Sequence, residues 1–318
     1  GDLAIDNAVE ATAGNASLLA GGAITQAAAG DVTVGGNLDV EAGGVITMDA
    51  DASSTSTGSG NIRYLSSLGD ITLGLLDAGT GNVRVEAQDG SIVDGRTALT
   101  NVIAANLQLL ASANVGAAGA NALDVDVDTL AAQATTGNIY ISEADGLNLT
   151  TVADFNVTRI GLDSTATATA VGALSNVLAA NNVKIETVAN GLTVTDTVTA
   201  TGGDLLLDAA GDLAIDNAVE ATAGNASLIA GGAITQAAAG DVTVGGTLDV
   251  DAQGGDITMT DGAISAATGN IRYLATGDIR LASLNGANVR VESTGGSIID
   301  NGDADVDIIA LTAQLQAA

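Results

Sequence analysis

Four residue types are missing from this 318-residue chain: proline, cysteine, histidine and tryptophan. Without cysteine and histidine there is no thiol or imidazole nucleophile, no disulfide, and no thiolate or imidazole ligand for zinc or haem. Ordinary proline usage of about 5 % would give roughly 16 prolines in a chain of this length. Any activity must therefore come from carboxylates, hydroxyls, amides or shape.

Aromatic side chains are also scarce, and the chain has only Tyr64, Tyr140, Phe155 and Tyr273. Because 47 % of the residues are nevertheless hydrophobic, the core must consist of Ala, Val, Leu and Ile. Small, uniform side chains of this kind suit the regular layers of a repetitive fold better than an irregular globular interior.

Basic residues are few, with 8 Lys and Arg against 38 Asp and Glu and a formal net charge of −30. We expect no nucleic-acid partner, since such binding depends on basic groups that neutralise phosphates. A mean hydropathy of +0.37 argues against a disordered chain. The longest apolar stretches, such as residues 18–30, fall short of the roughly 20 residues that span a bilayer, so we expect no membrane insertion.

A long internal repeat organises the chain. Residues 1–40 recur at 211–250 with 38 of 40 positions identical, the differences being Leu19 to Ile229 and Asn37 to Thr247. Further on, GNIRYL at residue 60 returns at 269 and NVRVE at residue 82 returns at 288. The chain therefore holds one copy of a unit of about 210 residues (1–210) and part of a second (211–318). It starts at Gly1 with no signal-type segment, and we expect it to be an excerpt of a longer protein.

A shorter rhythm runs inside the long unit: Gly, then Asp or Asn, then an alternating apolar and polar triplet. Examples are GDLAI at residue 1, GDVTV at 30, GNLDV at 36, GNIRY at 60, GDITL at 69, GNVRV at 81 and GNIYI at 137. Alternation with period two indicates a short strand with one apolar face, and the Gly-Asp/Asn pair indicates a turn that uses a positive φ or a side-chain-to-backbone bond.

These patterns predict an all-β fold, a right-handed parallel β-helix (β-solenoid) that runs as one continuous domain through residues 1–318. The handedness follows the general rule for parallel crossover connections. At about 20 to 24 residues per coil, we expect about 13 to 16 coils. A sandwich would need larger core residues, and a propeller would show a blade period that is absent here.

The repeats carry a family resemblance. Segments such as GNASLLAGGAITQAAAGDVTVGGNLDVEAGG and LDVDVDTLAAQATTGNIYI resemble the repeat regions of filamentous haemagglutinin-like giant exoproteins, which are adhesins of Gram-negative bacteria. The resemblance implies a β-helical shaft that is secreted to the cell surface through an outer-membrane two-partner transporter. It also implies a role in adhesion to other cells or surfaces.

Two acidic rows are candidates for binding calcium. Asp124, Asp126 and Asp128 in LDVDVDTL alternate along one predicted strand, and Asp303, Asp305 and Asp307 in DADVDII do the same. Calcium prefers several carboxylate oxygens, and neighbouring coils could complete such a site. The alternative is a solvated acidic face that keeps the molecule soluble.

Four arginines, Arg63, Arg84, Arg272 and Arg290, occupy matching places in the two copies. We expect them to face outward and to pair with acidic residues across strands, each pair contributing about 0.2 to 1 kcal/mol. Tyr64 and Tyr273, one residue later than Arg63 and Arg272, should then face the other side, towards the core or a corner.

We predict no catalytic residues and no cofactor other than possible Ca²⁺. Some β-helix proteins cleave polysaccharides with paired carboxylates, but such sites usually need an aromatic platform for the sugar. The expected function is a structural or adhesive extracellular fibre without catalysis. One alternative is a subunit whose identical copies stack end to end into a filament or sheath, and a polysaccharide-acting enzyme is a distant third.

Overall fold

The computed structural model describes residues 1–302 and 304–318, and every regular element among them is a β-strand. Their contacts divide the chain into two compact units. Unit 1 comprises Gly1–Ala144 and Thr151–Ser175, and unit 2 comprises Asp145–Thr150 and Asn176–Ala318. The prediction of an all-β fold is confirmed, while a single continuous solenoid through the whole chain stays a prediction. In the described residues, no helix has the length and hydropathy needed to cross a membrane.

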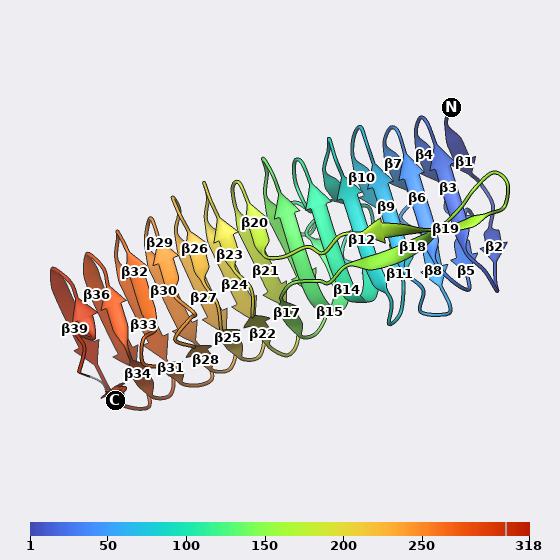
Figure 1. The fold of residues 1–318 in the computed structure, drawn as a ribbon. Coiled ribbons are helices and arrows are strands. Elements are labelled where there is room, and N and C mark those ends of the chain that lie inside the picture. Colours follow the sequence, from blue (N-terminus) through green and yellow to red (C-terminus); the bar gives the residue numbers. More distant parts are fainter. Residues whose placement is uncertain (303) are drawn as a thin grey trace. The chain divides into compact units, whose positions relative to one another are not determined.

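Unit 1 is a stack of coils in which strands pair in parallel with those of the next coil (Figure 1). The first ladder joins β1 (Leu3–Ile5), β4 (Ile24–Gln26), β7 (Ile46–Met48), β10 (Ile71–Leu73) and β13 (Ile92–Asp94). The second joins β2 (Val9–Ala11), β5 (Val32–Val34), β8 (Ser53–Ser56), β11 (Leu75–Asp77) and the start of β14 (Val102–Ala111). The long-strand ladder joins β3 (Ala16–Ala20), β6 (Leu38–Ala42), β9 (Ile62–Ser66), β12 (Asn82–Ala87), β14 and β15 (Leu123–Ala134), and β16 (Ile139–Glu143) then pairs with the start of β15.

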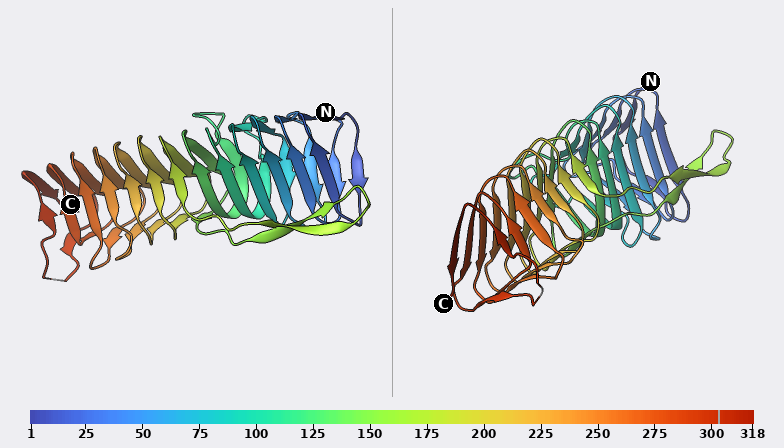
Figure 2. Two further views of the ribbon diagram at one scale, coloured as in Figure 1. Left: turned by 45° about the horizontal axis from the view of Figure 1, so that its top comes forward. Right: turned by 60° about the vertical axis from the view of Figure 1, so that its left-hand side comes forward.

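Unit 2 repeats this arrangement of three parallel ladders (Figure 2). The first joins β17 (Leu147–Leu149), β22 (Leu192–Val194), β25 (Leu213–Ile215), β28 (Ile234–Gln236), β31 (Ile257–Met259), β34 (Ile279–Leu281) and β37 (Ile298–Asp300). The second joins β20 (Val177–Ala179), β23 (Val198–Ala200), β26 (Val219–Ala221), β29 (Val242–Val244), β32 (Ile264–Ala267), β35 (Ser283–Asn285) and β38 (Ile308–Ile309). The long-strand ladder joins β21 (Val183–Thr187), β24 (Leu205–Ala209), β27 (Ala226–Ala230), β30 (Leu248–Ala252), β33 (Ile271–Ala275), β36 (Asn288–Ser293) and β39 (Thr312–Gln316).

The residue numbers of paired strands give the length of a coil. In unit 1 Leu3 pairs with Ile24, a step of 21 residues, and Ile46 pairs with Ile71, a step of 25. In unit 2 the step from Ile279 to Ile298 is 19 residues. These lengths bracket the predicted 20 to 24 residues per coil, and the predicted parallel β-solenoid is confirmed in each unit.

The core of each unit consists of like side chains stacked on one another. In unit 2 Leu207, Leu228 and Val250 occupy consecutive coils at the same register and are all buried. Stacking identical or similar side chains at a spacing of about 4.8 Å buries their apolar surface without large residues. This geometry explains why Ala, Val, Leu and Ile suffice.

The two core tyrosines show that both copies of the long repeat fold alike. Tyr64 and Tyr273 are buried, and each hydroxyl lies 2.7 Å from a buried serine hydroxyl, Ser54 and Ser265 respectively. Burial raises the pKa of both tyrosines well above the ordinary value. The prediction that they face away from the arginines is therefore confirmed, and they lie in the core.

The Gly-Asp/Asn motif works through its side chains more than through positive φ angles. The Oδ1 atom of Asn15 accepts the backbone N–H of Asn37 at 2.6 Å, and that of Asn37 accepts the backbone N–H of Asn61 at 2.8 Å. Asp204 and Asn225 are linked in the same way in unit 2. Of the glycines that open the motif, only Gly69 has a positive φ, so of the two predicted turn devices the side-chain-to-backbone bond is the common one.

Glycine is needed in the motif because coils approach one another closely. A Cβ atom on Gly30 would lie 2.0 Å from the carbonyl oxygen of Ile5 in the preceding coil. Gly240 meets Ile215 at the same distance. Any side chain at these two positions would push neighbouring coils apart.

We expect Gly30→Ala to destabilise the protein by about 1 to 3 kcal/mol, because the coils must separate locally to admit the methyl group. Gly240→Ala should have an effect of similar size. Gly14→Ala is the matched control, since nothing lies within 4 Å of a Cβ at that turn. Thermal unfolding followed by circular dichroism measures all three variants, and equal melting temperatures for Gly30→Ala and Gly14→Ala would contradict the close-approach argument.

Candidate functional site

An antiparallel β-hairpin interrupts the regular coils, and the sequence analysis did not predict it. β18 (Phe155–Ile160) pairs with β19 (Ala166–Val171), and Gly161 and Thr165 close the turn with a backbone hydrogen bond of 2.8 Å. The hairpin is inserted between two paired strands of unit 2. It lengthens the sequence separation of the paired residues Leu147 and Leu192 to 45 residues, about twice the length of a normal coil.

The hairpin lies across the outer face of the long-strand ladder of unit 1 (Figure 1). β18 contacts β3 and β6 directly. Its inner side contributes a small apolar cluster of Phe155, Val157 and Val171. We define the hairpin platform as the coil residues that hold this segment directly or through its charged cluster: Ser17, Asp39, Glu41, Arg63 and Gln108 on β3, β6, β9 and β14, with Asn37 and Asn61 directly before β6 and β9.

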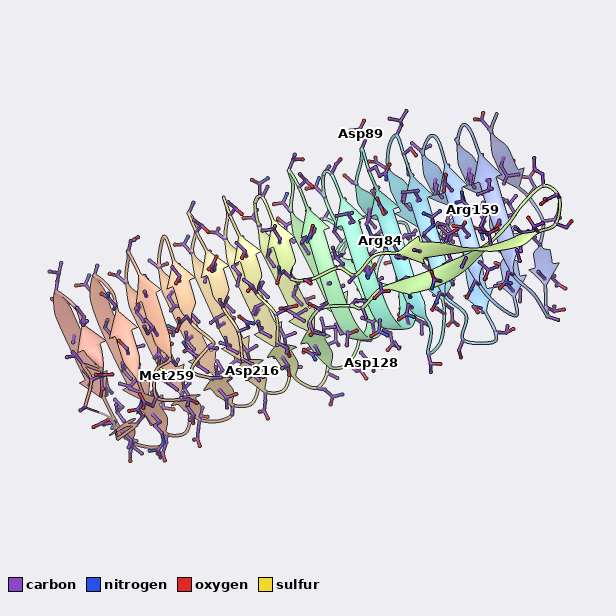
Figure 3. All side chains as sticks on the ribbon, in the orientation of Figure 1. Arg84, Asp89, Asp128, Arg159, Asp216 and Met259 are labelled. Carbon is purple, nitrogen blue, oxygen red and sulfur yellow. The ribbon has the colours of Figure 1, made fainter. Side chains whose placement is uncertain are left out.

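At the centre of the platform is a cluster of four charged side chains. Asp39 and Arg63 are direct neighbours on β6 and β9, and Arg63 Nε donates to Asp39 at 2.8 Å. Arg159 of the hairpin donates its Nε to the other oxygen of Asp39 at 2.7 Å. Both guanidinium groups also donate to Glu41. Figure 3 shows Arg159 above these strands.

This cluster is balanced in charge and partly shielded from water. Two carboxylates face two guanidinium groups, and the Asp39 side chain has no exposed surface. Burial alone would raise the pKa of Glu41, but hydrogen bonds from Arg159 and Arg63 and their positive charges lower it below the ordinary value. The hydrogen bond to Asp39 is the largest cause that raises the pKa of Arg159.

Neutral side chains of the platform bind the backbone of the hairpin. Ser17 Oγ accepts the N–H of Ile160 at 2.8 Å, and Asn61 Nδ2 donates to the carbonyl of Asn156 at 2.9 Å. Asn37 Nδ2 donates to the hydroxyl of Thr158 at 3.0 Å.

Gln108 fixes the base of the hairpin. Its side chain is fully buried, and Nε2 donates to the carbonyl oxygens of Val152 at 3.1 Å, Ala153 at 3.3 Å and Gly172 at 3.1 Å. The Oε1 atom of Gln108 accepts a hydrogen bond from Arg84 at 2.9 Å. The hairpin is therefore held at its base and along β18.

The predicted arginine pairs are confirmed in part. Arg63 and Arg272 pair across strands with Asp39 and Asp249. Arg84 and Arg290 instead bind glutamates two residues further along their own strands, Glu86 and Glu292. The role of Arg63 in holding a hairpin was missed, because nothing in the local sequence pattern relates residue 63 to residue 159.

The first acidic row lies on a strand as predicted. Asp124, Asp126 and Asp128 occupy alternate positions of β15, with Asp126 and Asp128 exposed. One carboxylate oxygen of Asp126 lies within 4.8 Å of one of Glu143, a residue that the sequence analysis did not single out. Glu143 is buried and accepts the backbone N–H of Val127 at 3.1 Å.

The second acidic row does not form the predicted strand. Asp305 and Asp307 lie in the irregular segment before β38, and Asp303 lies outside the described residues. At the local repeat offset of 206, Asp307 corresponds to Asn101, which is also in a loop in front of its strand. The carbonyls of both residues accept the backbone N–H of a leucine on the neighbouring strand, Leu76 for Asn101 and Leu284 for Asp307, at 2.7 Å.

We expect Arg159→Met to free the hairpin, because Asp39 and Glu41 lose a charged partner while the aliphatic stem is retained. The opening free energy of residues 155–171 should fall by at least about 2 kcal/mol. Hydrogen exchange of the hairpin amides measures the change. Arg272→Met, which breaks the matching ion pair of unit 2, is the control and should leave hairpin exchange unaltered.

Docking of the hairpin should also depend on pH. Because Glu41 has a lowered pKa in the docked state, its contribution is complete above the ordinary value of 4.5 and is lost as the pH falls through the lowered pKa. Since the chain has no cysteine, a dye on Leu162→Cys at the exposed tip reports docking through its anisotropy. The drop in anisotropy below pH 4.5 should be smaller in Glu41→Gln, and identical profiles for the two proteins would refute the assignment.

Comparison with known proteins supports the repeat character of the chain. A family model described as "Repeats of unknown function (DUF5649)" matches residues 1–59 and 202–268. These segments cover the start of the two copies of the long repeat, from β1 to β8 and from β24 to β32. No curated protein and no solved structure gives a significant match. The chain is thus similar, over less than half of its length, to a repeat family whose function is unknown.

Proposed function

We propose that this chain is part of the shaft of a large secreted bacterial surface protein of the filamentous haemagglutinin-like type. Its role would be to span distance outside the cell and to carry adhesive parts. The resemblance of the repeats to such exoproteins suggests this role, together with export through an outer-membrane two-partner transporter.

The equivalence of the two repeat copies is the observation that carries the proposal. Asp39 and Arg63 are neighbours in unit 1 as Asp249 and Arg272 are in unit 2, and Tyr64 and Tyr273 have matching serine partners. A sequence that folds in the same way each time it recurs can lengthen the stack of coils without any change in how the coils pack on one another.

The composition is consistent with an extended extracellular part. A formal charge of −30 limits lateral association of the coils with other molecules. A chain without cysteine and proline can be exported unfolded and can coil afterwards without waiting for disulfide exchange or proline isomerisation. On this proposal the chain needs no catalytic residue and no cofactor, and Asp124, Asp126 and Asp128 are the residues that would bind calcium.

Length measurement tests the proposal. A protein with an additional copy of residues 1–210 inserted after residue 210 should be longer by about 38 Å at constant width, because about eight further coils stack about 4.8 Å apart. Negative-stain electron microscopy of both proteins gives the lengths. An increase in width would contradict the shaft, whereas filaments that grow with concentration would favour the alternative of subunits stacked end to end.

A further inference from the structure

We propose that the long-strand face of unit 2 formed by β27, β30 and β33 is a second platform, and that it binds a second copy of the hairpin formed by residues 151–175. Within unit 2, no described segment lies over this face, although it repeats most of the groups that hold the hairpin in unit 1.

The platform residues recur in order. Ser17, Asp39, Asn61, Arg63 and Gln108 correspond to Ser227, Asp249, Asn270, Arg272 and Gln314 at the repeat offsets of 210, 209 and 206. Glu41 is replaced by Asp251, which keeps the carboxylate, and Asn37 by Thr247. Each equivalent strand keeps its register, since Asp249 pairs with Arg272 as Asp39 does with Arg63.

The charged groups of the second platform lack one cation compared with the first. Asp249 and Asp251 share the single guanidinium of Arg272, whereas Asp39 and Glu41 share two. The side chain of Asp249 is 39 % exposed and that of Arg272 40 %, compared with 0 % for Asp39 and 12 % for Arg63. Burial raises the pKa of Asp251, the opposite direction to Glu41. One further arginine, placed as Arg159 is, would balance the cluster.

The shape of the second platform also fits a hairpin. An open groove of about 360 Å³ is lined by Asn270, Arg272, Arg290 and Gln314, among others. Their counterparts in unit 1 are Asn61, Arg63, Arg84 and Gln108. Asn61 and Gln108 bond to the hairpin directly, and Arg63 shares its acidic partners with Arg159.

The occupant follows from the repeat. Residues 211–318 correspond to residues 1–112, so the part of the second copy present here includes the platform and not the hairpin segment, residues 151–175. A complete second copy would carry a hairpin at the equivalent place. The occupant is therefore this same segment, with its arginine, and not an unrelated peptide.

The test completes the second copy by appending residues 113–175 after residue 318 of the full chain. Leu162→Val in the appended segment, at the exposed tip, distinguishes the two hairpins by mass. We expect the amides of the appended hairpin to exchange within tenfold of those of the original hairpin. Exchange of the appended hairpin as fast as that of an unfolded peptide would overturn the proposal.

Reciprocal variants establish which platform holds which hairpin. Asp249→Asn with Asp251→Asn should accelerate exchange of the appended hairpin at least tenfold and leave the original one unchanged. The matched pair Asp39→Asn with Glu41→Gln should have the opposite selectivity. Each hairpin is an internal control for the folding of the other. The proposal would also be overturned if the appended hairpin were protected from exchange and this protection did not change in the variant Asp249→Asn with Asp251→Asn.

Discussion

The parallel backbone ladder is the constraint on which the rest of each unit depends. Every coil must place its strands on those of the preceding coil at the fixed spacing of the backbone hydrogen bonds. Side chains that do not fit this spacing are excluded, which explains the small apolar core and the glycine at residue 30, where a Cβ would meet the carbonyl of Ile5. The same spacing lets one asparagine bond to the next coil, as Asn37 does to Asn61.

Much of the coiled fold could be predicted from the sequence because the constraint of the parallel ladder acts within each coil. Each coil contains its own turn and its own alternating strands, so the rhythm that begins at GDLAI and GNIRY is sufficient to predict parallel coils and an inward Tyr64. Residues that pair in a ladder are also separated along the sequence by a nearly constant number of residues. The contact between Asp39 and Arg63 could therefore be anticipated.

The hairpin could not be predicted in this way. Its strands alternate like the others, and its partners on the platform are more than one hundred residues away, as Arg159 is from Asp39. The available signal was indirect: the only phenylalanine lies in the hairpin. A gap in the Gly-Asp and Gly-Asn rhythm is not specific, because the rhythm is interrupted between residues 138 and 203 and also between residues 82 and 137, where β14 and β15 form regular ladders. The second acidic row failed for a related reason, since alternation alone does not distinguish a strand from the loop that contains Asp307.

The hairpin platform adds a specific contact to an otherwise uniform scaffold. Its cluster combines Asp39, Glu41 and Arg63, all on the scaffold, with one residue of the inserted segment, Arg159. A repeat that carries both the platform and the inserted segment can thus place the same hairpin on each copy of the repeat, while the coils beneath remain unchanged.

The central claim is that stability arises between neighbouring coils and adds along the stack. Single-molecule force spectroscopy of the chain, with handles at residues 1 and 318, tests this most directly. The account predicts many small unfolding events, each releasing about one coil of 18 to 26 residues, or on the order of 70 Å of extended chain. A single all-or-none event that releases the whole chain would contradict it.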